Sequence, residues 1–503
     1  MPQLTALAFV AGVIFVCVLV VLRLRRLSPP LPPGPPGLPI LGNLFNLPRD
    51  RRWITYQAWA KEYGDIMHIS TLGRHMIILN SETAVLDLLE RRMNIYSDRP
   101  RSIMGELVGW SESVTTCSYG TLHREYRKMI SGVLAPRKLP DYWAMEEEKV
   151  ADFLRSTLKE PASASAHVKR LASAILLDMS HGYNVAEKND PIVALAERYN
   201  GEFSSTIVSG TYLVEMIPIL RHIPSWTGIR FKKDVLRVRR TMEMFRDDPY
   251  EETKIRAMNG TAKPSFITKI LEENSNPTPQ QELCFKWAAI AVYGAGIDTM
   301  IAGIESFFLA MSLYPAVQER AYAELLSVVG STRLPNFKDR EDLPYIAALI
   351  QELQRWNPVV PLALPHLLRQ DDIYRGYHLP KGSVVFANAW ALMHDPARYP
   401  EPFEFSPERF VNAPPSPRGR HSRAQAHEVN PDPRRYAFGF GRRACPGQFL
   451  ADDVLFIVIV STLAVFRIAP VEKTAERMEY TSGIIRCACS LPSFNTCAMD
   501  IDT

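Results

Sequence analysis

The sequence predicts a mainly helical protein with small β-sheets, folded as one large domain behind an N-terminal membrane segment. Three observations predict this class. Apolar stretches of helical length recur through the 503 residues, and residues 287–308 form a long one that is almost uninterrupted. Strand-like segments are short and lie around Gly or Pro turns, at residues 66–79 and 372–385. Neither an internal repeat nor a second composition class divides the sequence, so we expect one domain.

The first residues carry the membrane prediction. Residues 4–22 are apolar except for Thr5. As a helix, this segment is long enough to cross the hydrocarbon core of a bilayer. Arg23, Arg25 and Arg26 follow without a small-residue cleavage site, so a retained anchor fits better than a removed signal peptide. We therefore expect an anchor over residues 1–26, an extended proline-rich hinge over 27–39 and a cytosolic domain over 40–503.

Composition excludes several other classes of protein. The net charge is only +4, and the sequence has no basic tract with interleaved aromatics, which argues against nucleic-acid binding. Seven scattered cysteines, one of them inside the apolar leader, do not form a disulfide framework and fit a reducing compartment. Cys487, Cys489 and Cys497 lack the paired spacing of zinc sites and are interpreted as packing residues.

Local signals place several elements along the sequence. Residues 66–79 read as a hairpin around Gly73-Arg74, and Ser81 caps a helix that ends near Arg92. Residues 119–130 begin a basic helix, and residues 359–366 are extended because their prolines forbid helix. We expect a second hairpin over residues 372–385, turning around Pro380-Lys381-Gly382.

One segment, residues 436–447, carries the clearest chemistry. It reads Tyr-Ala-Phe-Gly-Phe-Gly-Arg-Arg-Ala-Cys-Pro-Gly and precedes an apolar helix over residues 448–460. Gly439 and Gly441 permit a tight loop, and the N-terminus of the helix favours a thiolate at Cys445. A thiolate in a rigid loop suits axial ligation of haem iron, although a lone cysteine is more often a buried and inert residue. The pattern F-G-x-G-x-R-x-C-x-G resembles the cysteine loop of the cytochrome P450 haem-thiolate monooxygenases.

Further motifs extend this resemblance from about residue 4 to about residue 495. Ala295, Gly296, Asp298 and Thr299 match A-G-x-D-T in a buried helix, where a carboxyl and a hydroxyl are costly without partners. In the family this acid and threonine supply protons during oxygen activation, so the resemblance makes Thr299 and Asp298 catalytic. The alternative is a threonine that only bonds an upstream carbonyl and kinks the helix.

The E-x-x-R motif and the P-E-R-F loop of the family also have counterparts here. The resemblance implies that Glu352, Arg355 and Arg409 lock together and hold the cysteine loop in place. It further implies the cytochrome P450 fold and a haem b whose iron is bound by Cys445. His123 stands where the family has Trp, and it can still donate an N–H. The implied haem contacts are Arg127, His123, His366, Arg443, Phe438, Gly439, Gly447 and Ala295.

The implied reaction is insertion of one oxygen atom from O₂ into a C–H or C=C bond. The sequence has no GxGxxG or flavin motif, so NADPH-derived electrons must come from a separate reductase, and the family also uses cytochrome b5. The implied location is the endoplasmic reticulum membrane, with the domain in the cytosol. Two alternatives are a reductase-independent haem-thiolate isomerase or peroxygenase, and a haem-bearing sensor. We expect the reductase to dock on basic residues of the cysteine side, namely Arg124, Lys128, Arg434, Arg435 and Arg442.

The substrate is the least determined feature. By family analogy the pocket is formed by residues 101–118, 201–219, 291–299, 359–364 and 482–486. These segments are mostly apolar, with Glu215 and Asp298 as acidic contacts, so we expect a hydrophobic small molecule. Local details resemble basidiomycete enzymes of secondary metabolism, including tryptamine hydroxylases and enzymes similar to O-methylsterigmatocystin oxidoreductase. Terpenoid, polyketide and indole substrates all remain open.

Overall fold

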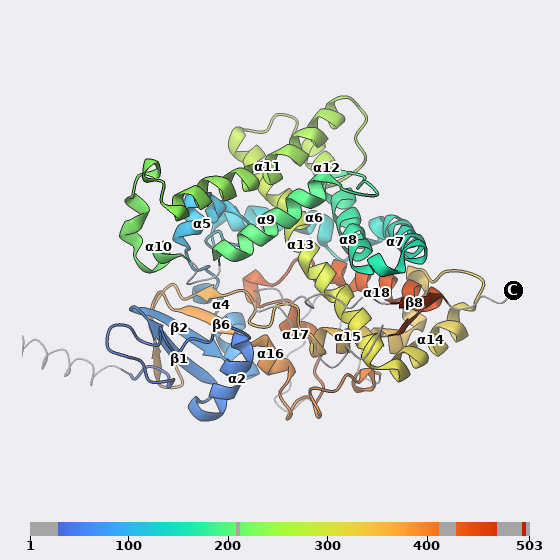
Figure 1. The fold of residues 1–503 in the computed structure, drawn as a ribbon. Helices are drawn as coiled ribbons and strands as arrows, with labels where there is room; N and C mark the ends of the chain where they lie inside the picture. The colour runs from blue at the N-terminus through green and yellow to red at the C-terminus, as the bar shows by residue number, and fades with distance from the viewer. Residues whose placement is uncertain (1–28, 208–211, 412–428, 470–494, 499–503) are drawn as a thin grey trace, which may run out of the picture.

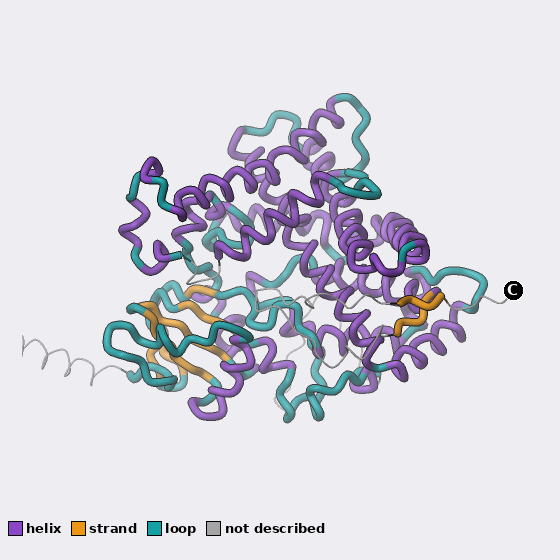
Figure 2. Tube along the Cα trace, viewed as in Figure 1, coloured by secondary structure: helices purple, strands orange, loops and turns teal. Residues whose placement is uncertain are grey.

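The computed structural model describes residues 29–207, 212–411, 429–469 and 495–498 (Figure 1). Helices form most of the molecule, and the larger sheet lies at one side of it (Figure 2). The helices of the first half are α2 (Arg52–Tyr63), α3 (Glu82–Val85), α4 (Met93–Tyr96), α5 (Ile103–Val108), α6 (Thr121–Leu134), α7 (Trp143–Lys159), α8 (Ala164–His181), α9 (Pro191–Ile207) and α10 (Leu213–Met216). Those of the second half are α11 (Arg230–Met258), α12 (Phe266–Glu273), α13 (Pro279–Leu313), α14 (Pro315–Val329), α15 (Pro344–Trp356), α16 (Ala389–Met393), α17 (Arg434–Ala437) and α18 (Gln448–Val465).

The long helix α13 runs through the middle of the molecule (Figure 1), as the apolar stretch at 287–308 predicts. A capping box between Thr278 and Gln281 starts it, with Pro279 in the first turn. It ends at Tyr314, which the following proline keeps out of the helical region. A Cβ on Gly296 would lie 2.9 Å from the side chain of Leu176, so glycine lets α8 approach closely.

Two described helices, α13 and α18, are long and apolar enough to cross a membrane. In each, 72% of the most apolar window is buried within the protein. Both are therefore mostly buried core helices of the domain. The predicted anchor over residues 1–26 lies outside the described residues, and so does the pocket segment at 482–486.

A mixed four-stranded sheet carries the predicted hairpin. Strand β1 (Ile66–Thr71) pairs antiparallel with β2 (Arg74–Leu79), which confirms the turn at Gly73-Arg74. β2 then pairs in parallel with β6 (Val384–Ala387), which pairs antiparallel with β3 (His366–Leu367). The Ser81 hydroxyl accepts from Ala84 N–H and caps α3, which continues as a π-helix over Leu86–Arg91, so this helix also ends where expected.

The second predicted hairpin turns at a different place. Strand β4 (Asp372–Tyr374) pairs with β5 (Tyr377–Leu379) around Arg375-Gly376, not around Pro380-Lys381-Gly382. Both turn residues have positive φ, 49° and 81°, and this two-residue turn closes the hairpin before the proline is reached. The chain after Pro380 turns again and enters β6 of the other sheet, so one expected hairpin is in fact two separate pairings. A last pair, β7 (Phe466–Ala469) with β8 (Asn495–Ala498), completes the described strands.

The described part of the proline-rich hinge lies against these sheets. The N–H of His68 in β1 donates to the Pro33 carbonyl at 2.9 Å, and the N–H of His378 in β5 donates to the Pro30 carbonyl at 2.8 Å. A Cβ on Gly34 would lie 2.0 Å from the carbonyl oxygen of His68. The segment is extended, as its composition predicts, and its backbone fastens it to the domain.

Candidate active site

The cysteine loop connects a short 3₁₀ turn over Gly441–Arg443 to helix α18. Gly439 and Gly441 have φ values of 75° and 57°, in the left-handed region that favours glycine. A Cβ on Gly441 would lie 2.4 Å from the carbonyl oxygen of Leu89, so another residue there would force the backbone apart. The N–H of Cys445 donates to the Phe438 carbonyl at 2.7 Å and closes the loop. The geometry therefore holds the thiol in one place at the N-terminus of α18.

Two side chains in this part of the core have unusual exposure. Cys445 is exposed although it lies deep in the protein, and Ala295 is exposed in the middle of the buried helix α13. Ala291 and Thr299, one turn to either side of Ala295, are partly exposed along the same helical face. Since the flanking residues Tyr293 and Ile297 are buried, this exposure comes from space inside the protein.

The charge state of the thiol depends on opposing effects. Burial raises the pKa of Cys445 above its ordinary value, while the N–H of Gly447 and the positive charge of Arg127 lower it. The position of Cys445 before α18 accounts for the lowering effect, whereas its burial arises only in the folded protein. A bound metal ion supplies a further, stronger pull, because coordination deprotonates a thiol outright.

Five nitrogen-bearing side chains from four segments of the chain gather beside this loop: Arg99, His123 and Arg127 of α6, His366 and Arg443. The pKa of Arg99 falls to about 9, first through burial and then through the charge of Arg443. The pKa values of His123 and His366 fall to about 3 through burial and the nearby arginines, so both rings are neutral at pH 7. The three arginines thus form a buried positive cluster.

Main-chain carbonyls fix these side chains. Arg127 Nη1 donates to Ala444 O at 2.7 Å. Arg443 donates to Ser97 O at 2.8 Å and to Cys117 O at 2.6 Å. Arg99 Nη1 donates to Leu364 O at 2.8 Å and to Pro365 O at 2.7 Å. His366 Nδ1 lies 2.7 Å from Tyr96 O. Yet Arg443 Nη1, Arg99 Nε and His123 Nδ1 are buried without a hydrogen-bond partner within the described residues. Buried donors without acceptors are costly, so the cluster fits an anionic ligand.

Arg99 is the member that sequence reasoning missed. Arg101, two residues further on, has a side chain that is 79% exposed and pairs with Glu106 at 2.8 Å. Arg99 is only 7% exposed. The two arginines flank Pro100, and no local pattern separates the buried one from the exposed one.

The acid and the alcohol of α13 lie next to each other as predicted. Thr299 Oγ1 donates to the carbonyls of Ala295 and Gly296, each at 3.1 Å, which is the contact that the alternative interpretation describes. This contact leaves the lone pairs of the hydroxyl available as acceptors. Burial raises the pKa of Asp298 above its ordinary value, and a hydrogen bond from Asn200 opposes the shift.

The residues Glu352, Arg355 and Arg409 do come together. Glu352 and Arg355 are fully buried and form two hydrogen bonds, at 2.6 and 2.8 Å, while Arg409 Nε lies 3.4 Å from Glu352 Oε1. The remaining donors of Arg355 reach the carbonyls of Met393, Pro402 and Glu404 at 3.0, 2.6 and 2.9 Å. The network therefore ties α15 to the backbone of residues 393–409.

Glu215 has a role other than substrate contact. Its carboxylate accepts from Ser102 Oγ at 2.7 Å and from Met104 N–H at 2.8 Å, and it is 7% exposed. It thus binds the start of α5 to α10 through Oε1. The apolar surroundings of Glu215 suggested a contact with substrate. In the structure they surround a buried carboxylate that anchors α5 to α10.

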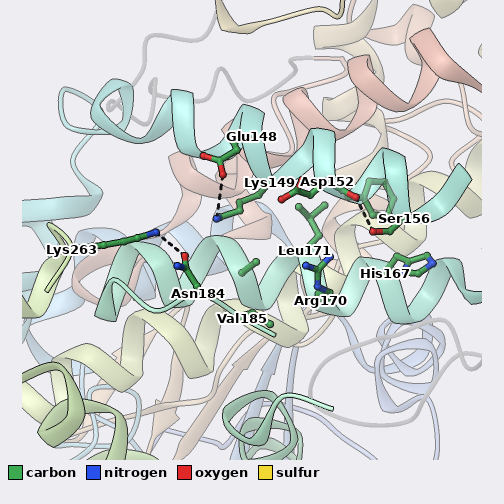
Figure 3. A pocket seen from close by; sticks show the side chains of 12 residues that line it. Glu148, Lys149, Asp152, Ser156, His167, Arg170, Leu171, Asn184, Val185 and Lys263 are labelled. Carbon is green, nitrogen blue, oxygen red and sulfur yellow. Dashed lines mark hydrogen bonds and ion pairs between the residues drawn. The ribbon is translucent and has the colours of Figure 1, made fainter. Parts of the chain in front are cut away.

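A separate groove of 310 Å³ lies on the outer side of α7 and α8 (Figure 3). Its charged side chains pair among themselves and with their surroundings: Lys149 lies 3.3 Å from Asp178, and Lys263 donates to Asn184 Oδ1 at 2.7 Å. His167 Nε2 lies 3.1 Å from Glu160 O. These pairings occupy its polar groups, so the groove lacks the spare donors that mark the arginine cluster.

A family model for cytochrome P450 matches residues 32–490, and the chain belongs to this family. Its relatives include cytochrome P450 monooxygenase 208 of Postia placenta, 42% identical over 453 residues, which cover 89% of this chain and 86% of the relative. Cytochrome P450 monooxygenase claR of Ampulloclitocybe clavipes is 39% identical over 435 residues, covering 86% and 78%. Cytochrome P450 monooxygenase COX2 of Coprinopsis cinerea is 36% identical over 440 residues, covering 86% and 81%.

These findings confirm the fold, the family and the similarity to basidiomycete enzymes. The family consists of oxidoreductases, it implies a haem with thiolate ligation, and its members generally need a redox partner and bind small substrates. The residues present fit such a group. A fixed thiol, an exposed small-residue face on α13 and buried cations with unpaired N–H groups match an iron, a flat ring and two propionates.

Proposed function

We propose that this chain is a membrane-associated monooxygenase that hydroxylates or epoxidises a mostly hydrophobic small molecule, using O₂ and electrons that originate from NADPH. Cys445 would bind the iron of haem b, and Arg99, Arg127, Arg443 and the two histidines would hold its propionates. The observation that carries this proposal is the buried arginine cluster beside the cysteine loop, with unpaired N–H groups at Arg99 and Arg443. Phe438, Gly439, Gly447 and Ala295 shape the contact with the ring.

The haem, when bound, supplies oxygen activation at its iron. The chain supplies and orients protons. Thr299 Oγ1 is fixed by two carbonyls on the exposed face of α13, and Asp298 precedes it. Because burial raises the pKa of Asp298, its carboxyl keeps a proton closer to neutral pH than an exposed acid does, which suits a proton donor.

Two alternative functions use the same haem-binding residues. A haem-thiolate isomerase or peroxygenase needs no reductase, and a haem sensor needs no turnover. The acid and threonine on α13 favour the monooxygenase, because neither alternative uses protons delivered during oxygen activation. Turnover that requires NADPH and a reductase would separate the monooxygenase from both.

In this proposal a reductase docks on the face of the protein that carries the loop of Cys445. Cytochrome b5 is a second electron donor. Arg442 lies over the ring of Tyr119 at 4.8 Å, so the loop adjoins the start of α6, which carries Arg124 and Lys128. Arg434 contributes little charge, since it pairs with Asp432 at 2.6 Å and with Asp452 at 3.2 Å. Charge reversal at Arg124, Lys128 and Arg442 should slow reduction and weaken its salt dependence. An unchanged reduction rate and salt dependence would contradict this docking face.

Membrane association is supported by exposed apolar side chains. Leu213, Ile219 and Trp226, between α9 and α11, are 68%, 71% and 85% exposed, and Ile40 and Phe45 near the hinge are 90% and 74% exposed. Large apolar side chains that are exposed together mark sites of contact with a membrane or with another protein. They fit a domain that faces the cytosol and rests on the endoplasmic reticulum membrane, in addition to an anchor over residues 1–26.

The substrate proposal rests on the apolar character of the described pocket segments. In these segments Trp110 packs edge-on against the ring of Phe203 at 4.9 Å and against that of Tyr199 at 6.3 Å. Terpenoids, polyketides and indoles of a fungal secondary pathway suit segments of such apolar and aromatic character.

The decisive experiment is co-expression with a fungal NADPH-cytochrome P450 reductase in yeast fed a panel of these compounds. Products are read by mass spectrometry, with Cys445→Ser as the control. A carbon monoxide difference spectrum typical of thiolate ligation, together with NADPH-dependent products, supports the proposal. Products that form equally without NADPH would contradict it.

A further inference from the structure

The 3₁₀ turn of the cysteine loop, over Gly441–Arg443, is capped by a residue from a distant part of the chain. The first N–H group of a helical turn has no acceptor inside the turn itself. Here the N–H of Gly441 donates to Oε1 of Glu90 at 2.7 Å, across 351 positions of sequence. Such caps normally come from the residue just before the turn, so this one depends on tertiary structure for its cap.

Gly441 also lies against the backbone next to Glu90. A Cβ on Gly441 would lie 2.4 Å from the carbonyl oxygen of Leu89 and 3.3 Å from the Cβ of Met93. The φ of Gly441, 57°, favours glycine as well. Glycine therefore permits the close approach that brings its N–H to the carboxylate.

Glu90 belongs to the π-helix that follows α3, a form of helix that is frequent at functional sites. This helix is tied to the hairpin of β4 and β5. Tyr374 Oη donates to Asp87 Oδ2 at 2.6 Å, and Arg92 pairs with Asp372 at 2.8 Å. The half-buried side chain of Glu90 thus meets the cysteine loop from a fixed support.

The other two residues of the turn contact the chain just after this helix. Arg442 Nη2 donates to Asn94 Oδ1, and Arg443 Nε donates to Ser97 O at 2.8 Å. Each residue of the turn is therefore bound to one short stretch of chain. Among these three acceptors Glu90 alone carries a charge, and hydrogen bonds to charged groups are about twice as strong as neutral ones.

We propose that Glu90 is a positioning residue for Cys445, because its carboxylate, bound to the N–H of Gly441, fixes the loop that carries the thiol. The N–H of Cys445 donates to Phe438 O and closes the same loop, so a shift at Gly441 changes where the sulfur points. Without Glu90 the sulfur more readily leaves the place in which it binds as a thiolate. The inference deepens the proposed function and rests on it for the group that Cys445 binds.

The first test measures hydrogen exchange at the N–H of Gly441 in the purified protein, by mass spectrometry with single-residue fragmentation, and needs no turnover. Glu90→Leu removes the acceptor and should speed this exchange by about tenfold or more, the effect of losing a hydrogen bond to a charged group. Glu90→Gln keeps a neutral acceptor of the same shape, so a smaller increase of about fivefold is expected.

The matched control for Glu90→Gln is Asp87→Asn. It removes an equal charge from the same π-helix, three residues away, and retains an acceptor for Tyr374. Exchange at Gly441 should equal that of the unmodified protein. Faster exchange in this control, to the same extent as in Glu90→Gln, would show a general loosening of the helix and overturn the role of Glu90.

The second test follows the carbon monoxide spectrum of the reduced protein during mild heating. The thiolate spectrum should convert to that of the neutral thiol about tenfold faster in Glu90→Leu, less so in Glu90→Gln, and at the unmodified rate in Asp87→Asn. Removing a negative charge by itself favours a nearby thiolate. Conversion toward the neutral thiol therefore reports the position of the loop and not the lost charge.

The two tests separate failure of this inference from failure of the proposed function. If the unmodified protein shows no thiolate spectrum, the proposed function fails, while the exchange rates still decide whether Glu90 holds the loop. Exchange at Gly441 that is unchanged in Glu90→Gln overturns the inference even in an active enzyme, and this variant covers the case in which Glu90→Leu fails to fold. Faster exchange with an unchanged rate of spectral conversion also overturns it, because Glu90 would then hold the turn without affecting the thiol.

Discussion

Glu352→Gln removes the one carboxylate that balances two buried guanidinium groups. The new side chain has nearly the same shape, so the change acts through charge and leaves packing almost unaltered. Arg355 is fully buried and bonds Glu352 at 2.6 and 2.8 Å, and Arg409 lies 3.4 Å away. Removing one partner of a buried ion pair costs about 3 to 5 kcal/mol, because the other charge remains without compensation.

The size of the thermal shift follows from the length of the chain. The entropy of unfolding is roughly 2.1 cal/mol/K per residue, or about 1 kcal/mol/K for 503 residues. A loss of about 3 to 5 kcal/mol therefore lowers the unfolding temperature by about 3 to 5 °C. The network also holds residues 393–409, so we expect the haem content per protein to fall before turnover per haem does.

The assay combines thermal unfolding followed by circular dichroism with the ratio of haem absorbance to protein. The matched control is Glu319→Gln, whose partner Arg467 is 62% exposed and which is itself 52% exposed. An exposed pair of this kind contributes about 0 to 1 kcal/mol, so its unfolding temperature should change by less than about 1 °C. If Glu352→Gln unfolds at the same temperature as Glu319→Gln and carries full haem, the bracing role is wrong.

Four further outcomes can be checked. Cys445→Ser should abolish both the thiolate spectrum and turnover, and a variant that kept both would contradict the ligand assignment. Thr299→Ala should keep its haem but divert electrons to hydrogen peroxide, measured as peroxide formed per NADPH consumed. Arg99→Met should weaken haem retention during competition with apomyoglobin, whereas Arg101→Met, at an exposed ion pair, should not. His181 has a pKa lowered to about 3 by burial, so from pH 6.5 downward the unfolded chain binds a proton that the folded protein does not, and stability falls. In urea titrations, His181→Gln should remove about 2 to 3 kcal/mol of the stability lost between pH 6.5 and about pH 4.5.

The parts of the site that the sequence predicted are those with local geometry. Gly439 and Gly441 must be glycine because of their own φ values, and Asp298 and Thr299 are conspicuous as polar residues in an apolar helix. Such signals need no knowledge of distant residues. The central helix, the first hairpin and the helix after Cys445 were predicted for the same reason.

The parts that the sequence did not predict depend on contacts between distant segments. Arg99 is buried by residues 364–366 and 443, and Asn200 meets Asp298 from another helix nearly 100 positions away. The residue type of Glu215 and its apolar segment suggested a contact with substrate, but its hydrogen bonds anchor one helix to another. Residues 372–385 contain two turn signals, one at Arg375-Gly376 and one at Pro380. Which of them closes the hairpin depends on the pairing of β6 with β2, which removes β6 from the hairpin.

The buried arginine cluster also affects the making of the protein. Three guanidinium groups that repel one another oppose closure of the chain around them until an anion arrives, so cofactor binding and completion of the fold are coupled. A newly made chain that fails to meet haem keeps this region open for longer and is exposed to proteases. The amount of mature protein in a cell should therefore follow the supply of haem as well as the rate of translation.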